Sequence, residues 1–237
     1  MAPSAGVGAR TTLRLERRLL REGPHLLASM DEVGRGALGG PVTVGVVLVD
    51  RTVTRALPGV RDSKLLSPGA RERLVPRIRA WAVGYAVGHA SAVEIDEVGI
   101  IGALRRAGLR ALAGLSVAPD AILLDGSHDW LSALGQGSLF DDDTGDRDCL
   151  PPVTMRVKAD LTCASVAAAS ILAKTERDAI MVELAHRHPE YGWAANKGYA
   201  APEHIEALRC HGPTVHHRQS WRLPVHEAAT VDSATPP

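Results

Sequence analysis

The sequence predicts a single α/β domain with a mixed five-stranded sheet, flanked by helices and followed by a helical C-terminal portion. Three observations support this fold class. The chain has 237 residues, which is enough for one such domain with its own core. Aliphatic, β-branched runs alternate with segments of helical periodicity. Hydrophobic residues make up 45% of the chain but aromatic residues only 3%, so the core must be mainly aliphatic.

The N-terminal part is expected to contain a short helix and a β-hairpin. We expect residues 1–11 to be flexible and residues 12–20 to form a helix with a basic outer face. Two strands are predicted at 27–33 and 42–49. A glycine-rich turn joins them, which favours an antiparallel hairpin.

A second helix is predicted after a loop that ends near residue 66. Ser67 and Pro68 are typical of a helix N-cap and first helical position. This helix should run to about Arg79, and Pro76 should kink or shorten it because proline lacks the amide N–H that an interior helical position needs.

The next elements are a third strand, a long helix and a buried fourth strand. Residues 81–89 alternate well enough for a strand. Ser91 and Glu94 form a capping box, which predicts the start of a helix. The run at 121–126 is apolar until it ends in Asp125 and Gly126, which is typical of a strand buried on both faces.

The C-terminal half is expected to continue with a loop, a fifth strand and two more helices. Residues 127–151 predict a loop that contains an acidic segment, and residues 153–160 alternate as a strand. A strong helix is predicted at 162–186, with small side chains in its first half that would let it lie close to the sheet. Pro202 starts a last helix, and residues 224–237 form an expected flexible tail after a domain spanning 12–223.

Charge and cysteine content restrict the class of protein. Lysine plus arginine and aspartate plus glutamate both number 27, so net charge gives no evidence for a nucleic-acid partner. The three cysteines, Cys149, Cys163 and Cys210, have no zinc-binding spacing, which favours a reducing compartment and a cytoplasmic location. No apolar run approaches the ~18 residues of a membrane span, so we expect no membrane role.

Four carboxylates lie at the predicted ends of three strands: Asp31 with Glu32, Asp125, and Asp160. Functional groups collect at the carboxyl ends of strands when neighbouring strands are parallel, so these acids are expected to converge. A set of oxygen ligands suits Mg²⁺ or Mn²⁺ better than zinc. Two such ions ~3.5–4 Å apart would clamp the attacking and leaving oxygens of a phosphodiester displacement.

The glycine turn also fits the letter pattern of a dinucleotide-binding loop. Gly34, Gly36 and Gly39 have the required spacing, and Gly40 follows. That motif needs a helix to open at the glycines, whereas residues 42–49 here predict a strand. The sequence context therefore excludes a nucleotide cofactor at this turn.

Each acid also has a simpler interpretation. Asp31 and Glu32 are neighbours, which face opposite sides of a regular strand, so both reach one metal only where the strand ends or bulges. Asp125 before a glycine is an ordinary turn residue, and Asp160 is an ordinary helix N-cap. For Arg177 and Asp178 we favour a solvent-exposed helix face.

These motifs, in this order, resemble those of bacterial type 2 ribonuclease H, the HII class. The matching segments are residues 31–36 (DEVGRG), 62–65 (DSKL), 124–126 (LDG), 158–160 (KAD), 168–174 (AASILAK) and 197–199 (KGY). Each motif is weak alone, but the set is specific and covers about residues 13–223. The HIII class usually has an additional N-terminal domain, and about 27 residues before the first strand are too few for one.

The resemblance implies a ribonuclease H-like fold and a metal-dependent endoribonuclease. It implies that Asp31, Glu32, Asp125 and Asp160 are catalytic and hold two ions, Mg²⁺ or Mn²⁺. The substrates would be RNA–DNA hybrids and duplex DNA with embedded ribonucleotides, cut to leave 3′-hydroxyl and 5′-phosphate ends. The chain would act as a monomer by default.

The resemblance also implies the substrate contacts. These are Gly34, Arg35 and Gly36, which would read the ribose 2′-hydroxyl through the backbone, Tyr199 on the neighbouring sugar, and Lys64 and Lys174 on phosphates. Two features depart from the family. The acidic segment 139–149 would repel a duplex, so we expect it to project away, and Ala201 stands where a serine or threonine cap is expected.

Two other functions remain open from the residues alone. One is a hybrid-binding protein without activity, which the neutral net charge and the adjacent acids would suit. The other is a two-metal nuclease that acts on DNA alone.

Overall fold

A computed structural model describes residues 10–132 and 150–225, and its centre is one five-stranded sheet. The strand order is β3-β2-β1-β4-β5. The strands are β1 (Leu27–Val33), β2 (Val42–Val49), β3 (Gly84–Ala90), β4 (Ala121–Asp125) and β5 (Val153–Arg156). β1, β2 and β3 pair antiparallel, whereas β4 is parallel to both β1 and β5. The sheet is therefore mixed, and the predicted hairpin and sheet class are confirmed.

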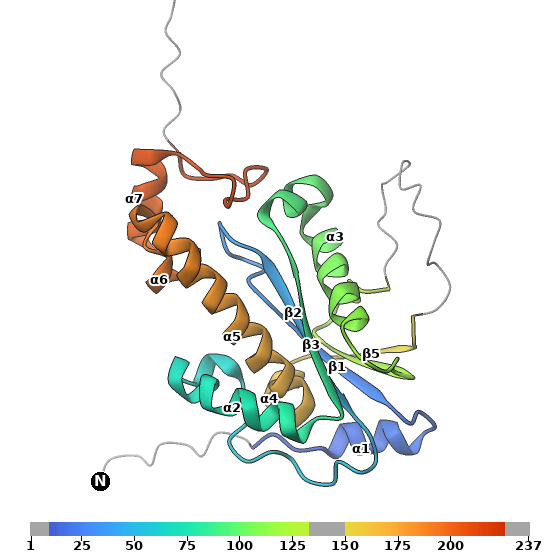
Figure 1. Ribbon diagram of the computed structural model, residues 1–237. Coiled ribbons are helices and arrows are strands. Elements are labelled where there is room, and N and C mark those ends of the chain that lie inside the picture. Colours follow the sequence, from blue (N-terminus) through green and yellow to red (C-terminus); the bar gives the residue numbers. More distant parts are fainter. Residues whose placement is uncertain (1–9, 133–149, 226–237) are drawn as a thin grey trace, which may run out of the picture.

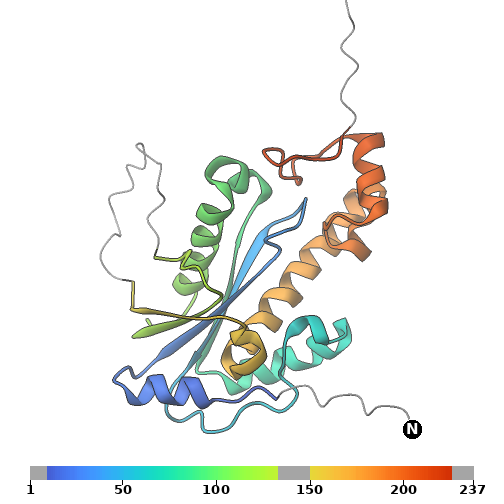
Figure 2. The ribbon, with the colours of Figure 1, turned by 180° about the vertical axis from the view of Figure 1, so that it is seen from behind.

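Helices cover both faces of the sheet, which is seen nearly edge-on between α5 and α3 in Figure 1 and from the other side in Figure 2. The α-helices are α1 (Arg14–Arg21), α2 (Pro68–Trp81), α3 (Ala92–Ala113), α4 (Ala159–Thr162), α5 (Ala164–Arg187), α6 (Trp193–Asn196) and α7 (Pro202–His211). Two 3₁₀ turns are η1 (Ser63–Leu65) and η2 (Pro189–Tyr191).

The first half of α5 lies unusually close to the sheet. Its small residues from Ala164 to Ser170 are all buried. A Cβ atom at Gly45 on β2 would come within 2.3 Å of the carbonyl oxygen of Ala169, so only glycine permits this approach. The predicted close packing of this helix on the sheet is confirmed.

A separate apolar cluster forms the helical C-terminal portion at the far end of α5. Its core includes Met181, Tyr191, Trp193 and Leu208, which come from α5, η2, α6 and α7. The rings of Tyr191 and Trp193 stack with their centroids 5.0 Å apart. This cluster places the loop after α6 beside the glycine-rich turn.

The predicted helix caps are confirmed. The Ser67 side chain accepts a hydrogen bond from the Ala70 amide at the start of α2. Ser91 and Glu94 form the full capping box of α3. Ala201 caps α7 without a side-chain hydrogen bond, as the departure from the family pattern predicts.

Two details of the second helix and third strand differ from the predictions. α2 continues past Pro76 to Trp81, so the predicted shortening is wrong. Pro76 and Glu72, whose carbonyl loses its partner, are both exposed, and water can satisfy that carbonyl. Trp81 therefore belongs to the helix, and β3 begins only at Gly84.

The fifth strand is shorter than predicted, and the loop before it is partly folded. β5 ends at Arg156, so Asp160 lies in the short helix α4 and not at a strand end. Trp130 and Leu131, inside the predicted loop, are buried in the core beneath α3. Thr11 also packs into the fold, because its hydroxyl donates to the Val60 carbonyl at 2.7 Å.

The expectations for residues 1–9, for the acidic segment 139–149 and for residues 226–237 lie outside the described residues. Within the described part of the chain, no helix is both long enough and apolar enough to cross a membrane.

Candidate active site

Three carboxylates from different elements converge at one end of the sheet. Asp31 on β1, Asp125 at the end of β4 and Asp160 in α4 each offer an oxygen, and these oxygens all lie within 4.8 Å of one another. The parallel register brings two of them together: Met30 pairs with Leu124, so the next residue on each strand is an aspartate. The predicted meeting of these three acids is thus present in the geometry.

A reversal of the chain brings Asp160 to the other two. Lys158 has a left-handed backbone with φ of +56°, which turns the chain directly after β5. The amide of Ala159 then donates to Asp125 Oδ1 at 2.7 Å. Asp125 therefore stabilises the turn that positions Asp160.

The cluster is electrostatically suited to a cation. Burial raises the pKa of Asp31 well above its usual value, and the neighbouring carboxylates of Asp125, Glu32 and Asp160 raise it further, although a hydrogen bond from Ser170 opposes them. Burial and Asp125 likewise raise the pKa of Asp160. Close carboxylates with this much mutual repulsion and only oxygen donors fit a hard divalent ion such as Mg²⁺ or Mn²⁺.

Glu32 lies beside the cluster but outside the group of three. It follows Asp31 on a regular strand and so faces the opposite side of the sheet. Its carboxylate lies 3.7 Å from the Arg35 guanidinium. Burial raises its pKa, while Arg35 and the indole of buried Trp130 act in the opposite direction. At this position Glu32 flanks the cluster from the α3 side.

Hydroxyl and amine groups complete the wall opposite the strands. The Ser63 and Ser170 hydroxyls are 2.9 Å apart and join η1 to α5. Lys64 Nζ lies 3.9 Å from Asp160 Oδ2. Burial alone would lower the pKa of Lys64, but the surrounding carboxylates, with Asp62 foremost, raise it overall. Lys64 thus stays a cation next to the acids, as a phosphate contact requires.

The glycine-rich turn is held by two buried arginines. Arg177 on α5 donates to the carbonyls of Pro41 at 2.8 Å and Gly39 at 3.1 Å. Arg218 donates to the carbonyls of Gly34 and, at 2.7 Å, Arg35. Both arginines are fully buried, so the solvent-exposed position predicted for Arg177 is wrong. The carbonyls of the turn face inward to these guanidinium groups.

The outer side of the turn is left open for a ligand. Within the described part of the chain, the amide N–H groups of Arg35 and Gly36 have no hydrogen-bond acceptor. A Cβ atom at Gly36 would meet nothing within 4 Å. At Gly34, where φ is +84°, a Cβ atom would lie 2.1 Å from Arg177 Nε. Gly34 is therefore required by the fold, whereas Gly36 borders open space.

Arg177 also connects the turn to Tyr199. Its Nη1 donates to the Lys197 carbonyl at 3.0 Å, and its guanidinium lies 5.4 Å from the centroid of the half-exposed Tyr199 ring. Lys174 lies one helical turn from Asp178 and binds it at 2.7 Å. Asp178 also binds Arg71 at 2.9 Å, so the exposed position predicted for Asp178 is wrong too.

Four residues that shape the site were not predicted as functional residues from the sequence. They are Arg177, Arg218, Trp130 and Ser170. Ser170 lies in one of the motifs and shares a helix face with Lys174, which is a usable signal. Arg177 and Arg218 bind backbone carbonyls, which leave no mark in the sequence.

A mixed five-stranded sheet with a buried carboxylate cluster at the ends of its parallel strands defines a metal-dependent nuclease of the ribonuclease H type. Comparisons with known proteins agree. The family model described as ribonuclease HII matches residues 28–223. A ribonuclease HII of Streptomyces coelicolor is 45% identical over 84% of this chain and 78% of its own length. A ribonuclease HII of Paracoccus denitrificans is 44% identical over 90% of this chain and 92% of its own.

Solved structures show the same fold. The crystal structure of ribonuclease H2 from Pyrococcus horikoshii superimposes with a TM-score of 0.64 at 27% identity, covering 84% of this chain and 95% of that one. The chain belongs to the ribonuclease HII family. It is a divalent-metal-dependent ribonuclease H.

Proposed function

We propose that the enzyme cuts the RNA strand of hybrids and also incises duplex DNA on the 5′ side of single embedded ribonucleotides. The products would carry 3′-hydroxyl and 5′-phosphate ends. Two divalent ions, Mg²⁺ or Mn²⁺, would be held by Asp31, Glu32, Asp125 and Asp160. The observation that carries this proposal is the convergence of three carboxylates beside a backbone turn with free amide groups.

The acids hold the ions, and the rest of the site positions the substrate. When bound, the ions supply charge neutralisation at the phosphate and polarise the attacking and leaving oxygens. Asp31 is fixed by Ser170, and Asp125 is fixed by the Ala159 amide, so neither carboxylate must reorganise when charge develops. Lys64 lies close enough to Asp160 to bind a phosphate oxygen at the same place.

Discrimination of ribose from deoxyribose is assigned to the glycine-rich turn. The 2′-hydroxyl is the group that differs between RNA and DNA, and it can accept a hydrogen bond from an amide N–H. The free amides of Arg35 and Gly36 are such donors. Tyr199, half-exposed and linked to the same turn through Arg177, would pack on the adjacent sugar. Lys174 would contact a phosphate from α5.

The decisive experiment compares two duplexes that differ in one hydroxyl. An all-DNA duplex and the same duplex with a single central ribonucleotide are incubated with the enzyme and either Mg²⁺ or Mn²⁺. We expect incision only on the 5′ side of the ribonucleotide. Equal cleavage of both duplexes would establish a DNA nuclease, and binding without cleavage in either metal would establish a hybrid-binding protein.

Variants of the acids test their roles. Asp31→Asn and Asp125→Asn should abolish cleavage while hybrid binding persists, because the carboxylates hold ions and the turn holds the sugar. The exposed Glu183 on α5 supplies a matched control, since Glu183→Gln also removes one negative charge. Unchanged turnover in either aspartate variant would contradict the assignment. Equilibrium dialysis with Mn²⁺ and a cleavage-resistant hybrid should count two bound ions.

The proposal treats the active species as a monomer located in the cytoplasm. Light scattering of the purified chain with and without a hybrid tests the first point, and a dimer in both conditions would contradict it.

A further inference from the structure

A hollow outside the carboxylate cluster lies between α1, α2 and the loop before η1. It has a volume of about 1050 Å³. Seven arginines line it, and none of the other lining residues is acidic. Four come from the start of the chain and α1, namely Arg10, Arg14, Arg17 and Arg21, and three come from the loop and α2, namely Arg61, Arg73 and Arg77. We call this hollow the arginine groove.

Among the described residues, the guanidinium groups of the arginine groove have no carboxylate partner. None of the seven forms an ion pair with a carboxylate of residues 10–132 or 150–225, although other arginines of the same helices do. Arg18 on α1, for example, binds Glu22, and Arg79 on α2 binds Glu176. The seven side chains belong to exposed residues, so their charges remain available to a ligand.

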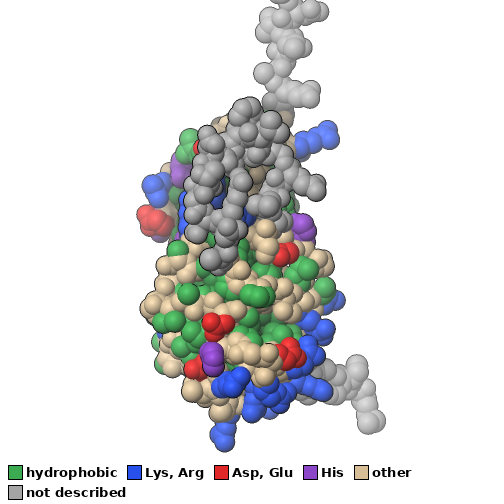
Figure 3. All heavy atoms as spheres, turned by 90° about the vertical axis from the view of Figure 1, so that its right-hand side faces the viewer, with side chains coloured by type: hydrophobic (Ala, Val, Ile, Leu, Met, Phe, Trp, Pro, Cys, Tyr) green, Lys and Arg blue, Asp and Glu red, His purple; other side chains and the backbone are tan. Residues whose placement is uncertain are grey.

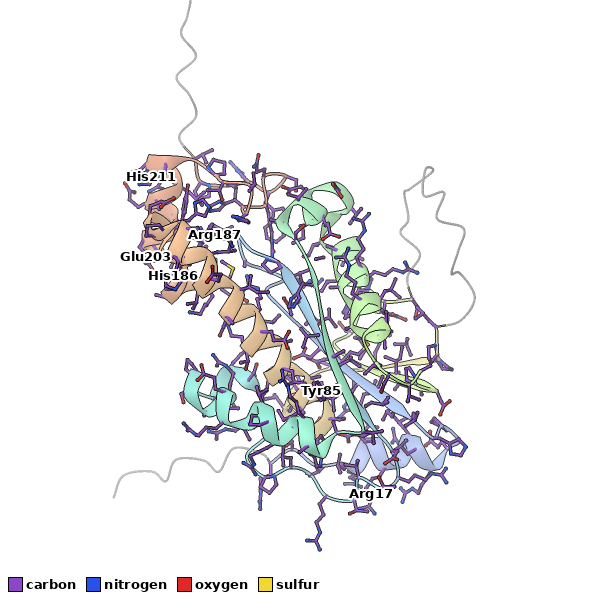
Figure 4. The ribbon with its side chains drawn as sticks, viewed as in Figure 1. Arg17, Tyr85, His186, Arg187, Glu203 and His211 are labelled. Atoms are coloured by element: carbon purple, nitrogen blue, oxygen red, sulfur yellow. The ribbon has the colours of Figure 1, made fainter. Side chains whose placement is uncertain are left out.

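The pictures place this charge at one end of the molecule. α1 and α2 lie at the lower end in Figure 1, with α4 between them in both ribbon views. Lysine and arginine side chains gather at the lower end of the face shown in Figure 3. Arg17 projects from the lower edge of the molecule in Figure 4.

The arginine groove shares its walls with the active site. Thr12 on its rim pairs with Cys163, three residues after Asp160, and its amide donates to the Thr162 carbonyl at 2.9 Å. Arg61 precedes Lys64 by three residues, a separation of roughly 10 Å at most along an extended chain. These two links place one side of the arginine groove next to the segments that carry Lys64 and Asp160.

We propose that the arginine groove binds the phosphodiester backbone of the substrate duplex outside the cleaved region. This inference rests on the proposed function, because it takes the substrate to be a nucleic acid. Arginine is the side chain best suited to phosphate, which its planar fork binds through two hydrogen bonds. Arginines at i and i+4 on α2 and at i, i+3 and i+7 on α1 form two facing rows, which suit a repeating anion better than a single one.

The sequence immediately before the arginine groove carries no negative side chain. Residues 1–9 contain no aspartate or glutamate, so the sequence there supplies no counter-charge for seven arginines. The groove would instead lengthen the footprint on the substrate and add salt-dependent affinity without reading sequence.

The test measures binding without cleavage, in EDTA, by fluorescence anisotropy. Two duplexes with the same central ribonucleotide are used, about 12 and about 30 base pairs long, which correspond to roughly 40 and 100 Å. The variant Arg17→Gln/Arg77→Gln removes one charge from each wall of the arginine groove. The control Arg18→Gln/Arg79→Gln removes the same charge from the same helices, at positions that do not line the groove.

We expect the groove variant to bind the long duplex on the order of tenfold more weakly than the unmodified enzyme and to lower the salt slope by about 2. It should bind the short duplex normally and cleave it at the normal rate, and the control should behave like the unmodified enzyme throughout. The proposal would be overturned if the groove variant and the control lost equal affinity for the long duplex. It would also be overturned if the groove variant lost equal affinity for both duplexes.

Two further outcomes distinguish this proposal from a site for a small polyanion and from the proposed function itself. If inorganic tripolyphosphate binds the unmodified enzyme but not the groove variant, while the long duplex binds both equally, the groove takes a small polyanion and the proposal is wrong. If the enzyme cleaves neither ribonucleotide duplex but the groove variant still loses affinity for the long one, the groove assignment stands and the proposed function falls.

Discussion

The guanidinium of Arg218 donates a hydrogen bond to the carbonyl of Gly34, 184 residues earlier in the chain. Arg218 is fully buried and lies 4.6 Å over the ring of Trp221. Burial, followed by the charge of Arg177, lowers its pKa to about 9, so it keeps its charge at neutral pH. The carbonyls on the inner side of the glycine-rich turn are thus bound by guanidinium donors, whereas the Arg35 and Gly36 amides have no acceptor among the described residues.

Arg218→Lys should weaken substrate binding more than it slows catalysis. Lysine keeps the charge but has no planar fork, so it cannot bind the Gly34 and Arg35 carbonyls together. Steady-state kinetics on a ribonucleotide duplex should show KM raised about tenfold and kcat changed less than threefold, a loss of ~1.4 kcal/mol in binding. Arg222→Lys, at an exposed residue of the same segment, is the control. A normal KM for Arg218→Lys would contradict the positioning role.

Two alanine substitutions in the glycine-rich turn should have opposite consequences for folding. Gly34→Ala should destabilise the protein by several kcal/mol, because the new Cβ atom would displace the buried Arg177 side chain and φ is positive. Gly36→Ala should leave stability within ~1 kcal/mol, because its Cβ atom meets nothing.

The same two substitutions distinguish an effect on folding from an effect on substrate recognition. Gly36→Ala should nevertheless reduce cleavage at a ribonucleotide, because the Cβ atom would occupy the side where a sugar approaches. Urea unfolding and cleavage assays on both variants supply the measurements. If Gly36→Ala is stable and fully active, the turn does not approach the sugar at this position.

Removing one carboxylate should stabilise the metal-free enzyme. The raised pKa of Asp31 shows that its ionised form is costly in the fold, because of burial and the adjacent acids. Asp31→Asn should therefore raise the melting temperature measured in EDTA at neutral pH by a few degrees, while it abolishes cleavage. Asp129→Asn, at an acid that caps a turn, serves as a contrast and should lower it. A lower melting temperature for Asp31→Asn would contradict the repulsion described here.

Acid should destabilise the helical C-terminal portion through a buried histidine pair. His204 Nε2 and His217 Nε2 are 3.1 Å apart, and both rings are fully buried. His204 donates through Nδ1 to the Tyr199 carbonyl, and His217 Nδ1 accepts from the Thr214 amide. Each ring is therefore neutral. A proton added to His217 Nδ1 would face the Thr214 amide N–H, and a proton added to His204 Nε2 would face the N–H of His217. Burial, with nearby histidines, lowers the pKa of His217 to about 4.

The sign of the pH effect follows from that shift. Above about pH 6.5 neither state binds the proton, and between pH 6.5 and 4 only the unfolded chain binds it, so stability falls as the pH falls. The loss should reach at most ~3 kcal/mol. Urea unfolding of His217→Gln should show a smaller fall over this range, while His186→Gln, at the exposed helix end labelled in Figure 4, should not. An unchanged pH dependence in His217→Gln would contradict this.

Local signals in the sequence were sufficient for most of the fold. The bounds of β1 and β2 agree with the prediction, and the caps of α2 and α3 are formed by the expected side chains. These features depend on side-chain chemistry within a few residues. The errors occur where the backbone conformation determines the structure. The end of β5, for example, depends on the left-handed conformation of Lys158, which lysine rarely adopts.

The same distinction applies to the site. Asp31 and Asp125 were predictable because they follow apolar runs near the carboxyl ends of strands, whereas Asp160 was expected at a strand end and lies in α4. Arg177 looked like part of a charged helix face, and its burial depends on carbonyl groups of a turn more than 130 residues away. Every residue type has a backbone carbonyl, so the sequence does not show which carbonyls an arginine will bind. Only the fold shows this.

The bridge between Thr12 and Cys163 has a consequence for how the protein is made. Thr12 forms backbone hydrogen bonds with Thr162 and Ala164 and a β-bridge with Cys163. Glu16 on α1 likewise accepts hydrogen bonds from Ser165. A ribosome adds these partners some 150 residues after Thr12, at about 5–20 residues per second. The contacts of the first helix can therefore be completed only after most of the sheet has been synthesised, seconds after Thr12 itself.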